Sequence, residues 1–244
     1  AVGRDSLLLN TTGANNTALG IYTMDSCTTA SSNTAVGYDA GGWTTGSNNV
    51  AVGASTLAAA TDGGANVAVG KNALKTQTSA ANNTGVGYGT LEVNTSGADN
   101  VALGYIALNA NTTGAYNVAV GKDSLKVNTT GQYNTAIGWN ALVANTTAGN
   151  INAFGAQALA ANTTGANNVA VGSNSSATNT TGANNTSVGN NSLRFNTTAS
   201  NNTAIGWSAL TANTTGDENV AVGSVALDAN TTGISDTALG SGSL

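Results

Sequence analysis

The sequence predicts an all-β chain folded as a parallel β-solenoid, or β-roll, of about fifteen coils of 17 residues each. A glycine returns at this spacing from Gly3 to Gly240, and only the step from Gly37 to Gly53 is one residue short. β-Branched and small residues alternate before each glycine, as in a short strand. The apolar positions also keep their phase through the chain, which argues against disorder despite the many Gly, Asn, Thr and Ser residues.

The repeat, numbered so that this glycine is position 3, has the consensus A-V-G-x-x-A-L-x-x-N-T-T-G-x-x-N-(T/V). Residues 117–121, Asn-Val-Ala-Val-Gly, show the alternation, which gives a strand one large and one small face. We expect the large side chains of position 2 and the leucines of position 7 to form the core. The predicted core residues are Val36, Val52, Val69, Val86, Leu103, Val120, Ile137, Phe154, Val171, Leu74, Leu108, Leu125 and Leu142.

The second half of the repeat predicts another short strand at positions 6 and 7, followed by a turn at Asn-Thr-Thr-Gly, as in residues 128–131. Glycine permits positive φ, and asparagine tolerates the left-handed region and bonds nearby backbone groups. In stacked coils the asparagines of position 16 would lie above one another and form amide ladders. Each coil is therefore expected to have two strands and two turns.

The unbroken repeat predicts a single continuous domain over residues 1–244, which we interpret as a segment of a longer fibre. Charged residues make up 7% of the chain and the net charge is −5, which disfavours nucleic-acid binding because that function needs a basic surface. No apolar run reaches the length of a membrane span, so no membrane insertion of this segment is expected.

The repeat also predicts association of several chains. One coil has only two or three sizeable apolar side chains, and burying them contributes roughly 4–7 kcal/mol, whereas ordering the coil costs about 25 kcal/mol. Backbone ladders and contacts between chains have to supply much of the difference. The Ala- and Gly-rich face of positions 1 and 3 is the place where we expect chains to meet.

The segments Asn66 to Leu74, Asn117 to Leu125 and Asn219 to Leu227 share the pattern Asn-Val-Ala-Val-Gly-x-x-Ala-Leu, apart from a Ser at the penultimate position of the second. This pattern resembles the head repeat of YadA-type trimeric autotransporter adhesins, and similar repeats occur in bacteriophage tail fibres. The resemblance covers the whole chain, although the adhesin repeat is shorter. It implies a left-handed parallel β-roll in which three chains form one trunk, and therefore a homotrimer.

Catalysis is not expected, because the chain has no histidine and its acidic residues are scattered. The same scarcity leads us to expect no catalytic residue, no cofactor and no metal site. Cys27 stands where most repeats have Asn, and two interpretations remain open: a neutral change at a turn, or a bridge between chains.

Aromatic residues recur at position 4, directly after the glycine. They form a candidate surface contact file of Tyr38, Tyr88, Tyr105, Trp139 and Trp207. Such residues could stack on sugars, build an interface or shield the turn beside them. The file is therefore the candidate site for a host surface glycan or protein.

Asn-x-Thr or Asn-x-Ser recurs along the chain and would place glycan acceptors in file if the source cell glycosylates, although the turn alone already explains these residue types. Examples are Asn15, Asn82, Asn94, Asn111, Asn145, Asn201 and Asn213. Regular threonines raise ice binding as another possibility, but Thr11 and Thr12 are adjacent and would point to opposite sides.

These observations favour an extracellular structural or adhesive fibre segment that displays a repeated surface, on a cell or on a virion. The alternatives are an extracellular filament of coils stacked head to tail and an ice-binding β-solenoid. The expected partner is the chain itself, as a homotrimer or a head-to-tail polymer.

Overall fold

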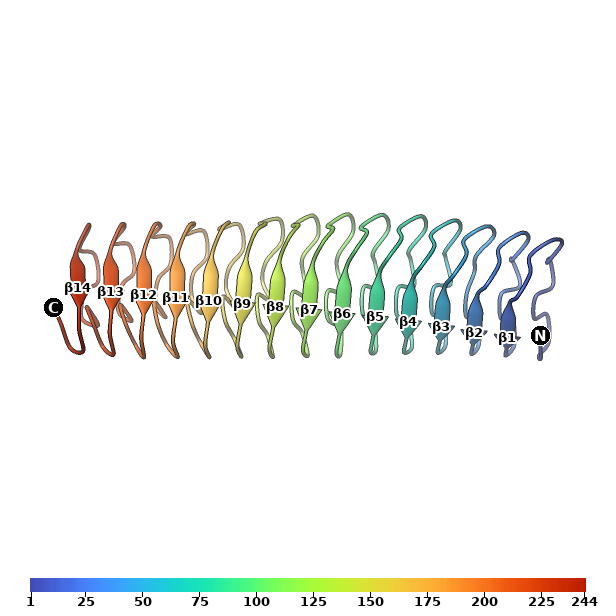
Figure 1. The fold of residues 1–244 in the computed structure, drawn as a ribbon, viewed down its shortest axis with the longest axis horizontal. Helices are drawn as coiled ribbons and strands as arrows, with labels where there is room; N and C mark the ends of the chain where they lie inside the picture. The colour runs from blue at the N-terminus through green and yellow to red at the C-terminus, as the bar shows by residue number, and fades with distance from the viewer. The chain divides into compact units, whose positions relative to one another are not determined.

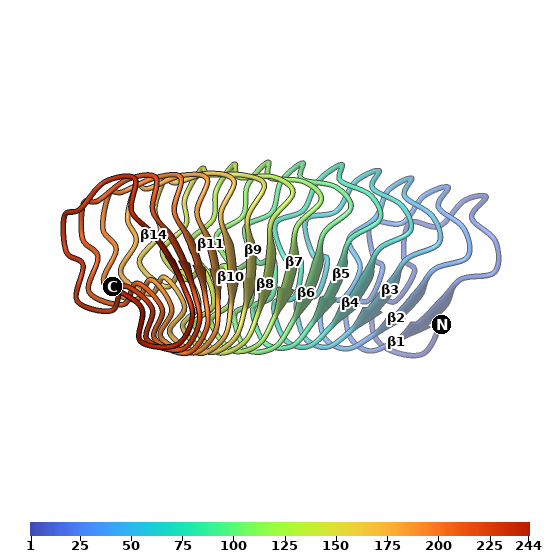
Figure 2. The ribbon, with the colours of Figure 1, turned by 60° about the vertical axis from the view of Figure 1, so that its left-hand side comes forward.

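The computed structural model describes residues 1–244, which divide into two compact units, Ala1–Asn117 and Val118–Leu244. Each unit is a parallel β-solenoid without a helix. Within each unit the strands lie side by side in sequence order, and the chain returns behind them to close each coil (Figures 1 and 2). The predicted fold class is therefore confirmed. The expectation of a single domain over residues 1–244 stays a prediction.

The first unit has six strands of three residues, each paired in parallel with the next at an offset of one repeat. The register joins Ala18 to Ala35, for example, and Ala51 to Ala68. The strands are β1 (Thr17–Leu19), β2 (Thr34–Val36), β3 (Val50–Val52), β4 (Val67–Val69), β5 (Thr84–Val86) and β6 (Val101–Leu103).

The second unit has eight strands with the same parallel pairing, which joins Ala136 to Ala153 and Ala204 to Ala221. The strands are β7 (Val118–Val120), β8 (Thr135–Ile137), β9 (Asn152–Phe154), β10 (Val169–Val171), β11 (Thr186–Val188), β12 (Thr203–Ile205), β13 (Val220–Val222) and β14 (Thr237–Leu239). Every strand in both units contains positions 17, 1 and 2 of the repeat.

The alanines of position 1 form the strand wall of the core. Ala51, Ala136 and Ala204 are fully buried between outward-facing neighbours. A β-carbon added to Gly85, which takes this position in β5, would lie 3.3 Å from Cδ1 of Leu74 and 2.9 Å from Oγ1 of Thr90. The strand wall and the opposite wall are therefore so close that position 1 has room for little more than a methyl group.

The predicted core at position 2 is wrong, because these side chains point out of the coil. A strand alternates its faces, so an inward alanine at position 1 forces both of its neighbours outward. The four residues Val36, Val69, Val86 and Val120 are half-buried, and Val52, Leu103, Ile137, Phe154 and Val171 are exposed.

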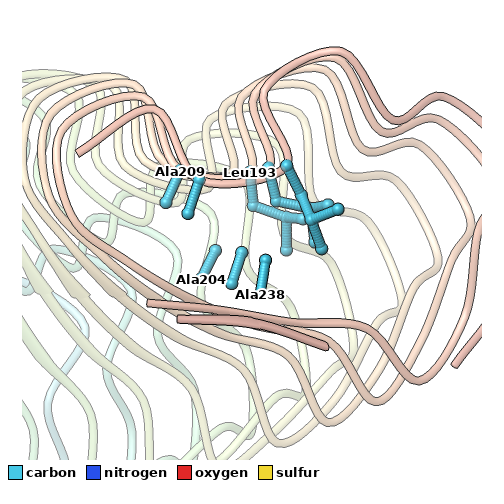
Figure 3. Packing of buried hydrophobic residues seen from close by; sticks show 8 residues of the cluster. Leu193, Ala204, Ala209 and Ala238 are labelled. Atoms are coloured by element: carbon cyan, nitrogen blue, oxygen red, sulfur yellow. The ribbon is translucent and has the colours of Figure 1, made fainter. Parts of the chain in front are cut away.

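The leucines of position 7 fill the core from the opposite wall. Leu74, Leu108, Leu125 and Leu142 are fully buried, as the sequence predicts. In Figure 3, Leu193 and Ala209 project from this wall towards Ala204 and Ala238 on the strands. Most coils thus pack one leucine against small residues.

The second predicted strand is absent, because positions 4 to 9 form turns. Positions 5 and 7 take the left-handed conformation, with φ of 59° at Asp123 and 48° at Leu125. The turn wall is still bonded to the next coil, since the Leu142 amide donates to the Ala158 carbonyl at 2.9 Å. Burial of the leucine and these ladder bonds stabilise a conformation that leucine alone disfavours.

The glycine that defines the repeat has both an unusual backbone conformation and no free space. Gly138 has φ 136°, and a β-carbon there would lie 2.5 Å from the carbonyl oxygen of Gly155. Successive coils approach each other backbone to backbone at this position. Glycine is therefore required by conformation and by contact.

Asparagine ladders join the coils at positions 16 and 10. The backbone N–H of Asn202 donates to the side-chain Oδ1 of Asn185 at 3.0 Å, which confirms the predicted ladder. At position 10, Nδ2 of Asn145 donates to Oδ1 of Asn128 at 3.0 Å and to the Ala148 carbonyl at 3.1 Å. These side chains are fully buried, and the ladders satisfy polar groups that would otherwise be costly to bury.

The coil that is one residue short has a different core. Trp43 is fully buried at the place of the position-10 asparagine, and Gly41 stands where other coils have leucine. A β-carbon on Gly41 would lie 2.8 Å from Cη2 of Trp43. The indole ring therefore occupies the space of the missing leucine.

Candidate interaction surface

The outward face of the strands is a continuous array of β-branched and aliphatic side chains in each unit. We call it the sheet face and define it by positions 17 and 2 of the strands. In the first unit it consists of Thr17, Leu19, Thr34, Val36, Val50, Val52, Val67, Val69, Thr84, Val86, Val101 and Leu103. In the second unit it consists of Val118, Val120, Thr135, Ile137, Asn152, Phe154, Val169, Val171, Thr186, Val188, Thr203, Ile205, Val220, Val222, Thr237 and Leu239.

The sheet face is uncharged, mostly apolar and accessible to solvent, with threonines at half of its position-17 sites. Leu103 in the first unit is 46% exposed, and Ile137 and Phe154 in the second are 38% and 37% exposed. Asn152 is its one amide side chain. Repeated exposure of large apolar side chains on a flat surface is typical of an interaction site.

The surface where the sequence predicted chains to meet is not accessible. The alanines of position 1 lie inside the coil, and the glycines of position 3 contact the next coil. Neither position is free to contact another chain. The residue types indicated a close backbone approach, but that approach occurs between coils of one chain.

The position-4 aromatic residues are exposed but do not form one uninterrupted file. Tyr38, Tyr88, Tyr105, Trp139 and Trp207 are between 44% and 58% exposed. The Tyr88 and Tyr105 rings stack with centroids 5.4 Å apart and planes at 12°. Trp139 and Trp207 are separated by coils that have Ala156, Ser173 and Asn190 at the same position.

Tyr38 has an aromatic neighbour that the position-4 pattern misses. The Tyr22 ring, from position 5 of the previous coil, meets it edge-on with centroids 5.9 Å apart. The Arg4 guanidinium lies 4.8 Å from the Tyr22 ring centroid on the other side. Adjacent coils bring positions 4 and 5 together here, which periodicity at a single position cannot show.

Polar side chains accompany the stacked tyrosine pair. Asn109 Nδ2 donates to the Gly89 carbonyl at 2.7 Å and to Oε2 of Glu92 at 3.1 Å. Asn72 Nδ2 donates to the other carboxylate oxygen of Glu92 at 3.2 Å. Two amides thus hold the carboxylate of Glu92 in the turn that follows Tyr88.

Asp123 is the centre of the one ion-pair cluster in the second unit. Its carboxylate lies 2.5 Å from Lys122 Nζ and 3.3 Å from Lys126 Nζ. Burial raises the pKa of the Asp123 carboxyl, but the hydrogen bonds and charges of the two lysines outweigh burial and hold its pKa below the usual value. The single carboxylate offsets one of the two lysine charges, so the cluster keeps a net charge of +1.

Cys27 is fully buried on the inside of its coil. Its Sγ lies 3.9 Å from Oδ1 of Asn10 and 3.8 Å from the Ala30 carbonyl, so it takes the place of a ladder asparagine. Burial raises the pKa of the thiol, and the hydrogen bond to Ala30 offsets this in part. This position favours the neutral-change interpretation over a bridge between chains.

The Thr-Thr turn presents one file of exposed threonines. Position-11 hydroxyls donate to the next coil, as from Thr163 Oγ1 to the Thr180 carbonyl at 3.0 Å. Position-12 threonines such as Thr147 and Thr164 are exposed. The two adjacent threonines therefore differ in environment, as the sequence predicts, and they form no flat array.

No group of three or more His, Cys, Asp or Glu side chains is placed to hold a metal ion. The surface has no pocket. No helix long and apolar enough to cross a membrane is present.

Comparison of the chain with protein-family models, curated proteins and solved structures gave no match.

Proposed function

We propose that this chain is a segment of an extracellular structural or adhesive fibre, on a cell or virion surface, that associates through its sheet face and displays a repeated surface. The observation that carries the proposal is the uncharged, mostly apolar sheet face of Ile137, Phe154, Val171 and their equivalents. A soluble chain that exposed such an array alone would risk aggregation, whereas association removes it from water.

The proposed partner on the sheet face is a second and a third copy of this chain. The face repeats at the spacing of the strands, and another copy presents side chains at the same spacing. The resemblance of the repeats to trimeric adhesin heads supports a closed group of three. Closure also uses every copy's face equally and so avoids open-ended growth.

The proposed mechanism is multivalent display rather than catalysis. Regular coils repeat similar turns many times, so weak contacts to a surface glycan or protein add up to high avidity. The aromatic residues of position 4 are the candidate contacts, and the stacked Tyr88–Tyr105 pair is the best developed of them.

Lysine substitutions on the sheet face test the association. Ile137, Phe154 and Val171 lie on neighbouring strands, and Thr147, Thr164 and Thr181 lie on the exposed turn of the same coils. We expect the triple Lys variant of the first set to sediment as a monomer of 23.6 kDa, and the Lys variant of the second set to remain associated. Equal association of both variants would exclude the sheet face as the interface.

Serine substitutions at position 4 test the display. We expect Tyr88, Tyr105, Trp139 and Trp207 changed together to Ser to weaken binding to arrays of oligosaccharides and host surface proteins without changing the assembly. Tyr116 and Tyr133, two exposed tyrosines of position 15, provide the control when both are changed to Ser. If the position-4 variant kept both its adhesion and its assembly, the contact role would be wrong.

An ice-binding solenoid is the second candidate, and the sheet face favours it more than the Thr-Thr turn does. A file of mainly Thr and Val side chains at position 17 runs beside a file of apolar side chains at position 2, on short parallel strands. A monomer in solution that shows thermal hysteresis would support this candidate. The third candidate is a head-to-tail filament, and fibres in electron micrographs of the purified chain would support it.

A further inference from the structure

We propose that Asn15, Asn82, Asn184 and Asn201 are acceptor sites for N-linked glycosylation and that the buried Asn-x-Thr/Ser sites of position 10 are not. All four occupy position 15, and each is followed by Asn and by a threonine at position 17 of the next strand. The proposal concerns modification of the chain and does not depend on the proposed function.

The position-15 asparagines are available to an enzyme. All four are exposed on the turn that leads into the strand. Nδ2 of Asn15 and of Asn201 makes no hydrogen bond within the chain. Asn82 Nδ2 donates one bond, to Asp99 Oδ1 at 2.9 Å, and Asn184 Nδ2 donates one, to Asn201 Oδ1 at 3.3 Å. An amide nitrogen carries two protons, so each retains a proton that can be replaced.

The position-10 asparagines that lie inside the coil are closed to the same reaction. Asn111 is fully buried, and its Nδ2 donates at 2.8 Å to both Asn94 Oδ1 and the Gly114 carbonyl. Asn213 is buried in the same way, with bonds of 3.0 Å to Asn196 Oδ1 and 2.9 Å to the Gly216 carbonyl. A glycan on either nitrogen would remove a buried hydrogen bond and has no space.

The reaction requires a nucleotide sugar as the glycosyl donor. The asparagine Nδ2 attacks the anomeric carbon of the sugar and forms the N–C bond. The bond between that carbon and the diphosphate oxygen breaks, and the nucleoside diphosphate leaves with its electrons. One amide proton passes to a base of the transferase. The remaining amide proton keeps the existing bond at Asn82 or Asn184.

The chain contains its own matched controls at position 17. Asn167 is an exposed position-15 asparagine, but Val169 stands where the threonine would be required. Val169→Thr completes the acceptor sequence there, and Thr186→Val removes the one at Asn184. Both residue types occur naturally at position 17 of other strands, so both variants should fold.

The test treats the folded chain with a purified N-glycosyltransferase of Asn-x-Ser/Thr specificity and UDP-glucose, followed by site mapping with mass spectrometry. A synthetic peptide of residues 180–190 controls for enzyme activity. We expect hexose on the four position-15 sites, gain of a fifth at Asn167 in Val169→Thr, and loss of Asn184 in Thr186→Val. Modification of the buried position-10 asparagines requires opening of the coil, so its rate should be lower by about 1,000-fold or more.

Two results would overturn the proposal. One is modification of the peptide without modification of the four sites in the folded chain. The other is hexose on Asn111, Asn145 or Asn213 of the folded chain at the rate of the position-15 sites.

Discussion

The role of each residue depends on which side of the strand its side chain takes. Position 1 faces the leucine of the opposite wall and allows only a small side chain, whereas position 2 faces solvent. Ile137 and Leu142 belong to the same coil and are of equal size, yet one is exposed and the other fully buried. The position in the coil, and not the chemistry of the side chain, therefore decides which of the two residues is buried.

We predict that Leu142→Ala lowers the free energy of unfolding by about 2–5 kcal/mol, because it leaves a cavity in the closed coil. Ile137→Ala in the same coil should lower the free energy of unfolding by less than about 1 kcal/mol, because the exposed Ile137 side chain buries little apolar surface within one chain. The measurement requires protein dilute enough to be monomeric. Urea unfolding of the two variants measures both values. Equal losses would place position 2 in the core after all.

Cys27 gives a second prediction at the residue scale. The thiolate is the reactive form, and burial raises the pKa of this thiol and blocks access to it. We expect a disulfide reagent such as DTNB to leave the folded chain unmodified near pH 8 and to react fully in urea. Rapid labelling of the folded chain, or a disulfide-linked dimer on a non-reducing gel, would contradict the burial of Cys27.

The coil is the repeated element of this fold, and the two coils with Gly41 and Ser176 at the leucine position have no large apolar side chain there. In the short coil, Trp43 replaces the core leucine and the ladder asparagine together, and its indole N–H has no hydrogen-bond partner. The absence of a neighbouring side chain at Gly41 is what makes room for the ring. The missing residue of this coil and Gly41 therefore act together to accommodate the Trp43 ring.

We predict that Trp43 emits at short wavelength and resists quenching by iodide, as expected of an indole inside a protein. Trp139 and Trp207 are exposed and would obscure this signal, so both are first changed to Phe. Gly41→Ala in that background should shift the emission to longer wavelength or unfold the coil, because a methyl group collides with the ring. A quenchable Trp43 would contradict the packing of the short coil.

The second unusual coil has a buried network of hydroxyls. Ser176 stands at the leucine position and donates to Ser187 Oγ at 2.8 Å, and Ser175 Oγ lies 2.7 Å from the same oxygen. Ser187 itself replaces the position-1 alanine and is fully buried. Each hydroxyl depends on its neighbours, because a buried hydroxyl without a partner is costly.

We predict opposite effects for single and double changes in this network. Ser187→Ala should lower the free energy of unfolding by about 1–3 kcal/mol, since it leaves the Ser176 hydroxyl without its partner. Ser176→Leu combined with Ser187→Ala restores the common core and should raise stability by roughly 1–3 kcal/mol. Thermal unfolding of these two variants and of the single variant Ser176→Leu completes a double-mutant cycle. Additive effects would show that the network is not coupled.

At the scale of the molecule, the sequence predicts the coil, the leucine core and the asparagine ladders, because the repeat marks each of them many times. It does not predict which face of the strand is inside. The alternation of Ala with Val does not show which of the two residues faces inward. The usual preference for large apolar residues in a core favours Val at position 2, whereas the alanine of position 1 is the buried residue. The decisive fact is the narrow space between the walls, shown by Gly85 against Leu74, which is a three-dimensional property.

The candidate surfaces could also be predicted only in part from the sequence. The aromatic residues of position 4 could be found from the repeat, and they are exposed. The sheet face could not be found, since it required the correct side of the strand. Likewise, the sequence shows where the Asn-x-Thr sites are, but only the structure separates exposed Asn201 from buried Asn213.

We propose that copies of the chain associate through the sheet face, and the native mass by light scattering tests this association. We expect a discrete particle of three times 23.6 kDa for the natural sequence. The sheet-face Lys variant should fall to the mass of one chain. A natural chain that remains a monomer at high concentration, with its sheet face in water, would contradict the account.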